Sequence, residues 1–186
     1  VFLEVMGLQW KALNKVYLST ITAVLFLFFS ASAFASQYKI YTLDNLIEAP
    51  FPGVPEDIGI INNDGQKYQG YNYVDNQSGL LFTSTLQKNK VVYSSKTIDR
   101  AIDSFINGSA IAMNGKVAFK SLGEIAGNRG AYFKITMTYQ GGKMHKSSAV
   151  LYEGGHFYTW SVIGQDDVLV TSTFNKYVKY FKMVSN

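Results

Sequence analysis

Residues 130–164 read GAYFKITMTYQGGKMHKSSAVLYEGGHFYTWSVIG, and this stretch decides the fold. It holds three runs in which side chains alternate, at residues 132–139, 144–153 and 156–163. A pair of glycines separates each run from the next. Alternation with a period of two, interrupted by two-residue glycine loops, is a strong short-range signal for antiparallel hairpins. The stretch therefore predicts a meander of three antiparallel strands.

The two glycine pairs also predict which residues face each other. With Gly141 and Gly142 as the first loop, Tyr139 should pair with Met144. With Gly154 and Gly155 as the second, Tyr152 should pair with Phe157, and Ala149 with Trp160. One face would then carry Phe133, Ile135, Met137, Tyr139, Val150, Phe157 and Ile163, and the other Tyr132, Ala149, Leu151, Tyr158, Trp160 and Val162. Both faces are largely apolar, so we expect other elements to cover the sheet on both sides.

The first 35 residues have the pattern of a secretory signal peptide. Lys11 and Lys15 precede an apolar run at residues 16–29, and small residues end in an A-x-A site at Ala35. We therefore expect residues 1–35 to be a signal peptide and residues 36–186 to form one domain, exported to the periplasm or the cell exterior. A membrane anchor is the alternative, although the run is short for a spanning helix.

Composition excludes several classes of function. The chain has no cysteine, which removes thiol catalysis, iron–sulfur clusters and cysteine zinc sites. Its 17 basic and 13 acidic residues give a net charge of +4. Without Lys11, Lys15 and Glu4, the expected domain has 15 basic and 12 acidic residues, a net charge of +3. So weak an excess does not favour a nucleic-acid partner.

Further strands are expected on both sides of the chain's midpoint. Residues 38–43 predict a short strand, and residues 67–74 and 80–86 predict a hairpin. Residues 46–57 contain three prolines, which cannot donate to a ladder, so we expect an edge segment or an extended loop there. One more strand is expected at residues 117–122.

Two helices are expected. An apolar stripe predicts a helix over residues 97–107, with Ser95 or Thr97 as its cap and Gly108 as the left-handed residue that ends it. A closing helix is expected over residues 171–183. Its inward side chains would be Phe174, Tyr177, Val178 and Phe181.

This order of elements resembles the Mog1/PsbP-like family. The resemblance rests on Phe51-Pro52-Gly53-Val54-Pro55, the helix at 98–106, the glycine-rich residues 123–130 before the meander, residues 158–162, and residues 174–181. It implies an α+β fold: an α/β/α sandwich around a mainly antiparallel sheet with a C-terminal three-strand meander and a closing helix. Members of the family are mostly not enzymes but binding or accessory subunits, so it implies no catalytic residues.

The residues that could carry chemistry are few. His145 and His156 should lie at opposite ends of one hairpin, roughly 25–35 Å apart, too far to share a metal. We expect both to be exposed, with His156 opposite Glu153. Asp75 belongs to a turn that resembles a calcium loop but offers a single carboxylate, so no metal or cofactor is expected. The adjacent acids at 56–57 and 166–167 are expected in solvated loops.

Two groups of residues are candidate binding surfaces. Tyr68, Tyr71 and Tyr73 alternate with Gln, Gly and Asn, a composition that suits adaptable recognition and equally suits an ordinary strand. Lys176, Lys179 and Lys182 are spaced by three along the expected closing helix. They could meet an acidic partner or anionic lipid headgroups, or form only the solvated face of that helix.

The sequence favours a non-enzymatic, exported binding or accessory module with a protein partner in the cell envelope. Peripheral membrane contact is compatible with this hypothesis, and a monomer or weak homo-oligomer is expected. Two alternatives stay open. One is a carrier of a small apolar ligand or lipid, which needs a cavity between the sheet and a helix. The other is a hydrolase using scattered carboxylates, which needs two acids converging in one cleft.

Overall fold

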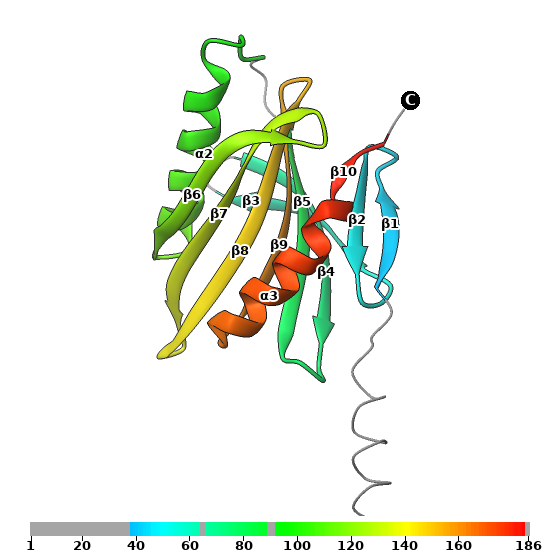
Figure 1. Ribbon diagram of the computed structural model, residues 1–186, viewed down its shortest axis with the longest axis vertical. Helices are drawn as coiled ribbons and strands as arrows, with labels where there is room; N and C mark the ends of the chain where they lie inside the picture. The colour runs from blue at the N-terminus through cyan, green and yellow to red at the C-terminus, as the bar shows by residue number, and fades with distance from the viewer. Residues whose placement is uncertain (1–37, 64–65, 89–91, 185–186) are drawn as a thin grey trace, which may run out of the picture. The chain divides into compact units, whose positions relative to one another are not determined.

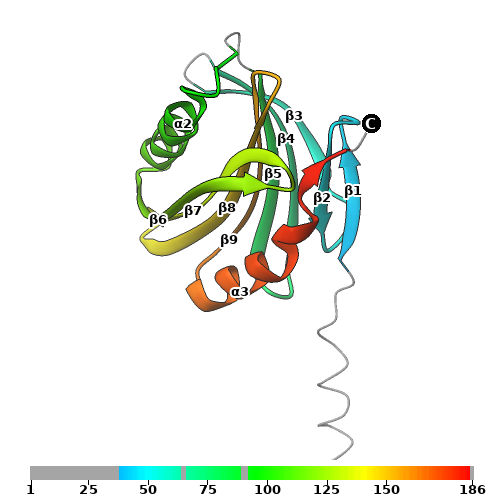
Figure 2. The same ribbon diagram turned by 45° about the horizontal axis from the view of Figure 1, so that its top comes forward.

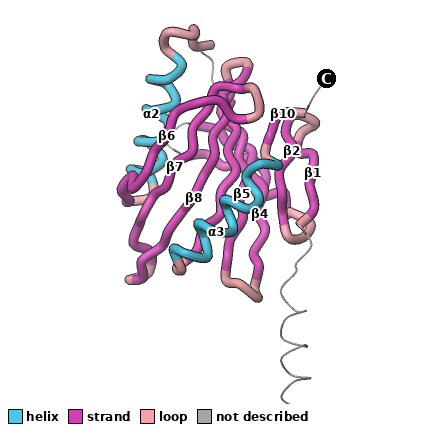
Figure 3. The backbone as a smooth tube through the Cα atoms, viewed as in Figure 1, coloured by secondary structure: helices cyan, strands magenta, loops and turns pink. Residues whose placement is uncertain are grey.

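A computed structural model describes residues 38–63, 66–88 and 92–184. The expected signal peptide, residues 1–35, lies outside the described residues. The described residues form an α+β fold, as predicted, with two α-helices and with two antiparallel sheets where one was expected (Figure 1). Strands make up most of the described residues, as the tube view in Figure 3 shows.

The larger sheet has seven strands. Their spatial order is β3 (Glu56–Asn63), β4 (Gln66–Asp75), β5 (Leu80–Lys88), β9 (His156–Gly164), β8 (Gly142–Glu153), β7 (Asn128–Tyr139) and β6 (Gly115–Ile125). Each neighbouring pair is antiparallel, and β3 and β6 form the two edges. The sequence pattern missed β3, because a bulge between Asp57 and Gly59 interrupts its alternation.

The meander forms as predicted, with one correction to its register. In the second hairpin Tyr152 pairs with Phe157, and Ala149 pairs with Trp160, as expected. In the first hairpin Tyr139 pairs with Gly142 instead of Met144. The loop residues are Gln140 and Gly141, both with positive φ (49° and 77°), so the turn lies one residue earlier than expected. The pairing moves by two residues along β8, so the predicted faces are unchanged.

Helix α2 (Ile98–Ala112) covers one face of this sheet, where it packs on β6, β7 and β8 (Figure 2). The core beneath it consists of Ile102, Ile106, Ala110, Ala131, Phe133, Ile135, Val150, Tyr152 and Phe157. The expected end at Gly108 is wrong, because Ala110 extends the buried stripe by another turn and Asn114 is the left-handed residue (φ 48°). Thr97 is the N-cap residue, but its hydroxyl does not cap a backbone N–H group of the helix. It donates a hydrogen bond to the backbone carbonyl of Ser94.

The opposite face is covered by helix α3 (Asp167–Tyr177) and by a small three-stranded sheet. This sheet has the order β1 (Lys39–Leu43), β2 (Ile47–Phe51) and β10 (Lys182–Met183). Its core residues include Ala49, Phe51, Phe82, Trp160, Val162, Val170, Phe174 and Phe181. The prediction that both faces of the meander are covered is therefore confirmed.

Two expected elements differ from the structure. Residues 47–51 form the central strand β2, and not only an edge segment or loop, yet β10 pairs with Ile47 and Glu48 alone. Within the described residues, no strand therefore lies beside Pro50 on the β10 side. Because Pro50 has no N–H to donate, this position costs the sheet no hydrogen bond. The closing helix begins at Asp167, four residues early, and ends at Tyr177, followed by a 3₁₀ turn, η1 (Val178–Tyr180), and β10.

Candidate functional site

The three tyrosines predicted to bind a partner lie on β4 but not on one surface. Tyr71 and Tyr73 point to the side of α3, where both pack against the core, and Tyr68 lies on the side of α2. The Tyr71 hydroxyl donates a 2.8 Å hydrogen bond to Asp44, in the turn between β1 and β2. The pKa of Tyr71 is raised to about 12, mainly by burial and secondly by this hydrogen bond. Tyr71 and Tyr73 thus help to hold the small sheet on the large one.

The three C-terminal lysines do not share one helix face. Lys176 is in α3, Lys179 in η1 and Lys182 in β10. The first two lie over the rings of Tyr177 and Tyr180, at 4.9 and 5.0 Å from the ring centroids. Lys182 forms an ion pair of 3.2 Å with Glu48. Of the three, Lys176 and Lys179 are left exposed without a carboxylate partner in the described residues.

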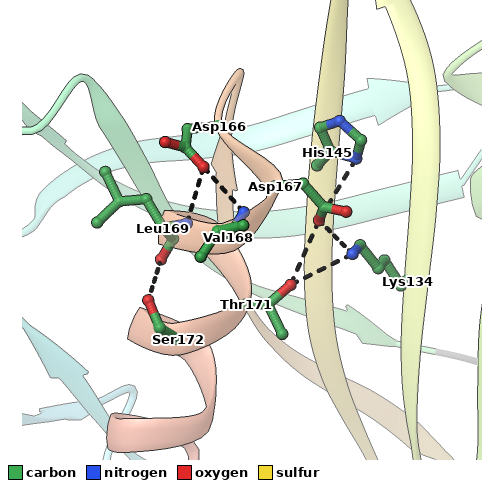
Figure 4. A network of polar contacts seen from close by, with 8 residues as sticks. All are labelled: Lys134, His145, Asp166, Asp167, Val168, Leu169, Thr171 and Ser172. Atoms are coloured by element: carbon green, nitrogen blue, oxygen red, sulfur yellow. Dashed lines mark hydrogen bonds and ion pairs between the residues drawn. The ribbon is translucent and has the colours of Figure 1, made fainter.

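A polar cluster joins the start of α3 to β7 and β8 (Figure 4). Asp167 forms an ion pair with Lys134, accepts a 3.3 Å bond from Thr171, and lies 3.6 Å from Nδ1 of His145. These contacts, led by the bond from Lys134, lower the pKa of Asp167. Asp166 accepts bonds from the backbone N–H groups of residues 168 and 169, so it caps the helix.

This cluster corrects two expectations. His145 is buried, with 7% of its surface exposed, because the start of α3 covers it. Asp166 and Asp167 are not both in a loop, since one caps α3 and the other binds the sheet. The carboxylate of Asp167 stands between the Thr171 hydroxyl and the imidazole. In a catalytic triad the imidazole itself must contact the nucleophile, so the observed order suits a structural clamp.

The second histidine lies where the register placed it. His156 pairs with Glu153 across the second hairpin, far along the sheet from His145, which pairs with Gly164. It is partly buried, not fully exposed as expected, and its ring packs edge-on against that of Tyr158. The two histidines therefore lie at opposite ends of the hairpin.

Asp75, which was considered as a metal ligand, and two acids of α2 are engaged in local contacts. Within the described residues, no group of three or more His, Asp or Glu side chains is arranged to hold a metal ion. Asp75 bonds the backbone N–H of Gln77 and the hydroxyl of Ser78, and so closes its own turn. Asp99 and Asp103 of α2 pair with Arg129 and Lys120. Arg129 lowers the pKa of Asp99 through its hydrogen bonds.

An exposed apolar surface lies along the edge strand β3 and the segment that leads into it. We call Val54, Ile58 and Ile60 the edge patch; their exposed fractions are 79%, 40% and 65%. The sequence analysis missed it because residues 46–57 were assigned to an edge segment or loop and residues 58–61 to no element. The available signal was the sequence Ile58-Gly59-Ile60-Ile61, which predicts a strand once its glycine is interpreted as a bulge.

Within the described residues, no helix is both long and apolar enough to cross a membrane. Neither a protein-family model nor a curated protein sequence matches the chain. Three solved structures share its fold at low sequence identity. PA94, a protein of unknown function from Pseudomonas aeruginosa, has 9% identity and a TM-score of 0.48, with 80% of this chain and 97% of PA94 covered.

The second is CyanoP, the cyanobacterial PsbP of Synechocystis, with 10% identity, a TM-score of 0.45 and coverage of 82% and 96%. This chain is similar in fold to a PsbP protein. The third is LpqN of Mycobacterium tuberculosis, involved in cell envelope biogenesis, with 11% identity, a TM-score of 0.46 and coverage of 80% and 91%. The family that the sequence resembles is thus among the structural neighbours, and the likeness concerns the fold alone.

Proposed function

We propose that this protein is a non-enzymatic, exported accessory module that binds a partner protein of the cell envelope. Export is supported by the basic, apolar and small residues of the first 35 positions. Binding is supported by one observation, the exposed apolar edge patch on β3. The module itself is proposed to be a monomer or a weak homo-oligomer.

The edge patch suits a partner that supplies an extended strand. Among the described residues, β3 has β4 on one side and no strand on the other, so half of its backbone hydrogen-bonding groups face outward there. The regular part of the strand begins at Gly59, after the bulge. A partner strand laid along it would gain main-chain hydrogen bonds, and Ile60 would supply apolar contact.

The opposite edge of the sheet offers a natural comparison. Strand β6 carries Lys116 and Lys120, and a bulge between Val117 and Phe119. Lysines on an edge strand are common protection against edge-to-edge pairing, and they distinguish the two edges, since both strands contain a bulge. Residues 56–60 of β3 contain no lysine, and the acidic residues Glu56 and Asp57 precede the bulge. The two edges therefore differ in the charged side chains that they expose, and β3 is the better candidate to pair with a strand of a partner protein.

Affinity capture tests this proposal. Protein expressed from the full sequence is immobilised and exposed to envelope extract of its own organism, and bound proteins are identified by mass spectrometry. Ile60→Lys places a charge on the edge patch and should reduce capture of the main partner at least 10-fold. Phe119→Lys, at an exposed apolar position of β6, is the matched control and should capture as much as the unmodified protein.

Other outcomes would contradict the proposal in different ways. Equal capture by both variants would remove the edge patch as the binding surface. Loss of capture only in Lys176→Ala/Lys179→Ala would place the surface on α3 and η1 instead, as the sequence hypothesis had it. Capture of lipid or a small molecule without protein would favour the carrier alternative and exclude the accessory module. Tyr71 is a poor probe, because its bond to Asp44 supports the fold.

A further inference from the structure

Strand β3, one edge of the large sheet, presents an acidic and an apolar side chain on the same face. Asp57 pairs with Tyr71 of β4. Ile60 pairs with Gln69, two positions away on β4. Because directly paired residues share a face, Asp57 and Ile60 both point to the side of α3, as Tyr71 does. The bulge absorbs the extra residue between them, and they lie roughly 7 Å apart along the edge.

Strand β6, the other edge, presents a basic and an apolar side chain in the same arrangement. Lys116 pairs with Thr136 of β7. Phe119 pairs with Lys134, whose amine contacts Asp167 at the start of α3. Lys116 and Phe119 therefore also lie on the α3 side, and again a bulge separates them. Both side chains are exposed.

The charges of Asp57 and Lys116 are not neutralised by ion pairs. Asp57 accepts hydrogen bonds from the backbone N–H of Gly59 (2.8 Å) and from the side-chain amide of Gln69 (2.6 Å), and both donors are neutral. Among the described residues, neither Asp57 nor Lys116 forms an ion pair. Each edge thus keeps one uncompensated charge next to one exposed apolar side chain, and the two charges have opposite signs.

The directions of the two edge strands match as well. Every neighbouring pair in the seven-stranded sheet is antiparallel, so β3 and β6, the first and last strands, run in the same direction. A second copy that continues the sheet would therefore place its β6 parallel to β3, with α3 of both copies on the same face. In both strands, four residues from the charged to the apolar one lie opposite three residues of the inner neighbour. Their spacings therefore agree.

We propose that the β3 edge of one copy pairs with the β6 edge of a second copy, so that the large sheet continues from one molecule into the next. In this register Asp57 meets Lys116 of the second copy, and Ile60 meets its Phe119. The contact is heterologous, because two different surfaces meet. A lysine on an edge discourages pairing between two like edges but favours pairing with an acidic one.

This association is expected to be weak and dependent on concentration. Only one short strand of each copy takes part, so the contact is smaller than a stable interface requires. The second copy uses the same edge of β3 as the proposed partner strand and competes with it. The inference does not rest on that partner, because it follows from the two edges of this chain alone.

Sedimentation velocity tests the proposal. Protein expressed from the full sequence is measured over a wide range of concentrations at low and at high salt. We expect the sedimentation coefficient to rise with concentration, and the association constant to fall at least 3-fold at high salt, because salt screens exposed charges. Lys116→Glu should lower this constant at least 10-fold, since it places like charges opposite each other. Protein that stays monomeric at all concentrations would overturn the proposal.

A charge exchange separates this contact from non-specific association. Asp57→Lys should weaken association as Lys116→Glu does, and the double variant Asp57→Lys/Lys116→Glu should restore it to within about 3-fold of the unmodified protein. A double variant no better than the single ones would overturn the proposal. Lys143→Glu, at an exposed position of β8, is the matched control and should leave the association constant unchanged. If Asp57→Lys does not fold, Lys116→Glu and Lys143→Glu still decide the test.

Failure of this inference and failure of the proposed function give different results. Phe119→Lys removes the apolar contact on β6 and should reduce self-association at least 10-fold, while capture of the envelope partner is unchanged. Self-association that persists in Phe119→Lys but is lost in Ile60→Lys would place another surface opposite β3 and overturn the role of β6. Normal self-association without any captured partner would support this inference and contradict only the proposed function.

Discussion

The indole nitrogen of Trp160 donates a 2.9 Å hydrogen bond to the backbone carbonyl of Pro50, and this bond joins the two sheets. Both residues are fully buried. Trp160 is in the centre of the large sheet and Pro50 in the small one, so the bond spans 110 positions of sequence. It satisfies a carbonyl that the short strand β10 does not reach.

Trp160→Phe should destabilise the protein by about 2–4 kcal/mol, because it removes both ring volume and the donor to a buried carbonyl. Urea unfolding followed by circular dichroism measures this loss. Tyr139→Phe, at an exposed position of the first hairpin, is the control and should change the free energy of unfolding by less than about 0.5 kcal/mol. Equal stability of the two variants would mean that the Trp160–Pro50 hydrogen bond contributes nothing to the free energy of unfolding.

Asp167→Asn should weaken the clamp between α3 and the sheet in a pH-dependent way. The pKa of Asp167 is lowered in the folded state, so its carboxylate stabilises the fold above the ordinary aspartate pKa, and this stability is lost as the pH falls through the lowered value. Because the side chain is 45% exposed, we expect a loss of only about 0.5–1 kcal/mol at pH 7.

Urea unfolding of the unmodified protein and the variant at pH 7 and at pH 3 checks this effect. The difference between them should shrink at pH 3, which lies below the ordinary aspartate pKa, because the carboxyl then binds a proton in the unfolded state and the advantage of the lowered pKa decreases. Lys134→Met removes the main partner and serves as the second variant; it too should lose stability at pH 7. A difference that is the same at both pH values would contradict the electrostatic origin.

Two glycine substitutions should change the free energy of unfolding in opposite directions. A β-carbon at Gly130 would collide with the backbone carbonyl of Val150, so Gly130→Ala should cost about 2–3 kcal/mol. Gly108 is inside α2 with open space around it, so Gly108→Ala should add about 0.5–1 kcal/mol. Thermal unfolding of both variants checks the pair, and a destabilised Gly108→Ala protein would show that the helix ends at this residue.

Gln140 adopts a left-handed conformation in the first hairpin loop, with φ of 49°. Asparagine tolerates this conformation better, and Asn-Gly is the favoured pair for such loops. Gln140→Asn should therefore raise stability by about 0.5 kcal/mol. Gln77→Asn, in a turn where residue 77 has no positive φ, is the matched control for thermal unfolding. A gain of the same size in both variants would contradict the conformational reason.

Much of the sheet could be predicted because its signals are local. Tyr152 and Phe157 lie on either side of Gly154-Gly155, so alternation and turn together determine their pairing. The first hairpin is harder, since Gln140 replaces a glycine in the left-handed position and no pattern indicates that it will do so. The error of two residues in pairing left the faces correct, because side chains alternate with a period of two.

The candidate sites depended on contacts that no local pattern contains. Tyr71, a candidate binding residue, donates a hydrogen bond to Asp44, 27 positions earlier in the sequence. His145 looked exposed because it lies near a turn, but the start of α3, more than 20 positions later, covers it. The sequence analysis did not connect Lys134 with His145, because their shared contact, Asp167, is distant in sequence.

The sequence by itself determined the meander, its two apolar faces and the need to cover both, because alternation and turn chemistry act between residues close along the chain. Only the tertiary structure decided what covers those faces. In it α3 ends at Tyr177, Lys182 and Met183 pair with β2, and Asp167 lies beside Lys134. These outcomes depend on groups that are distant in sequence and meet only after the sheet has formed, since desolvation and pairing are properties of packed neighbours.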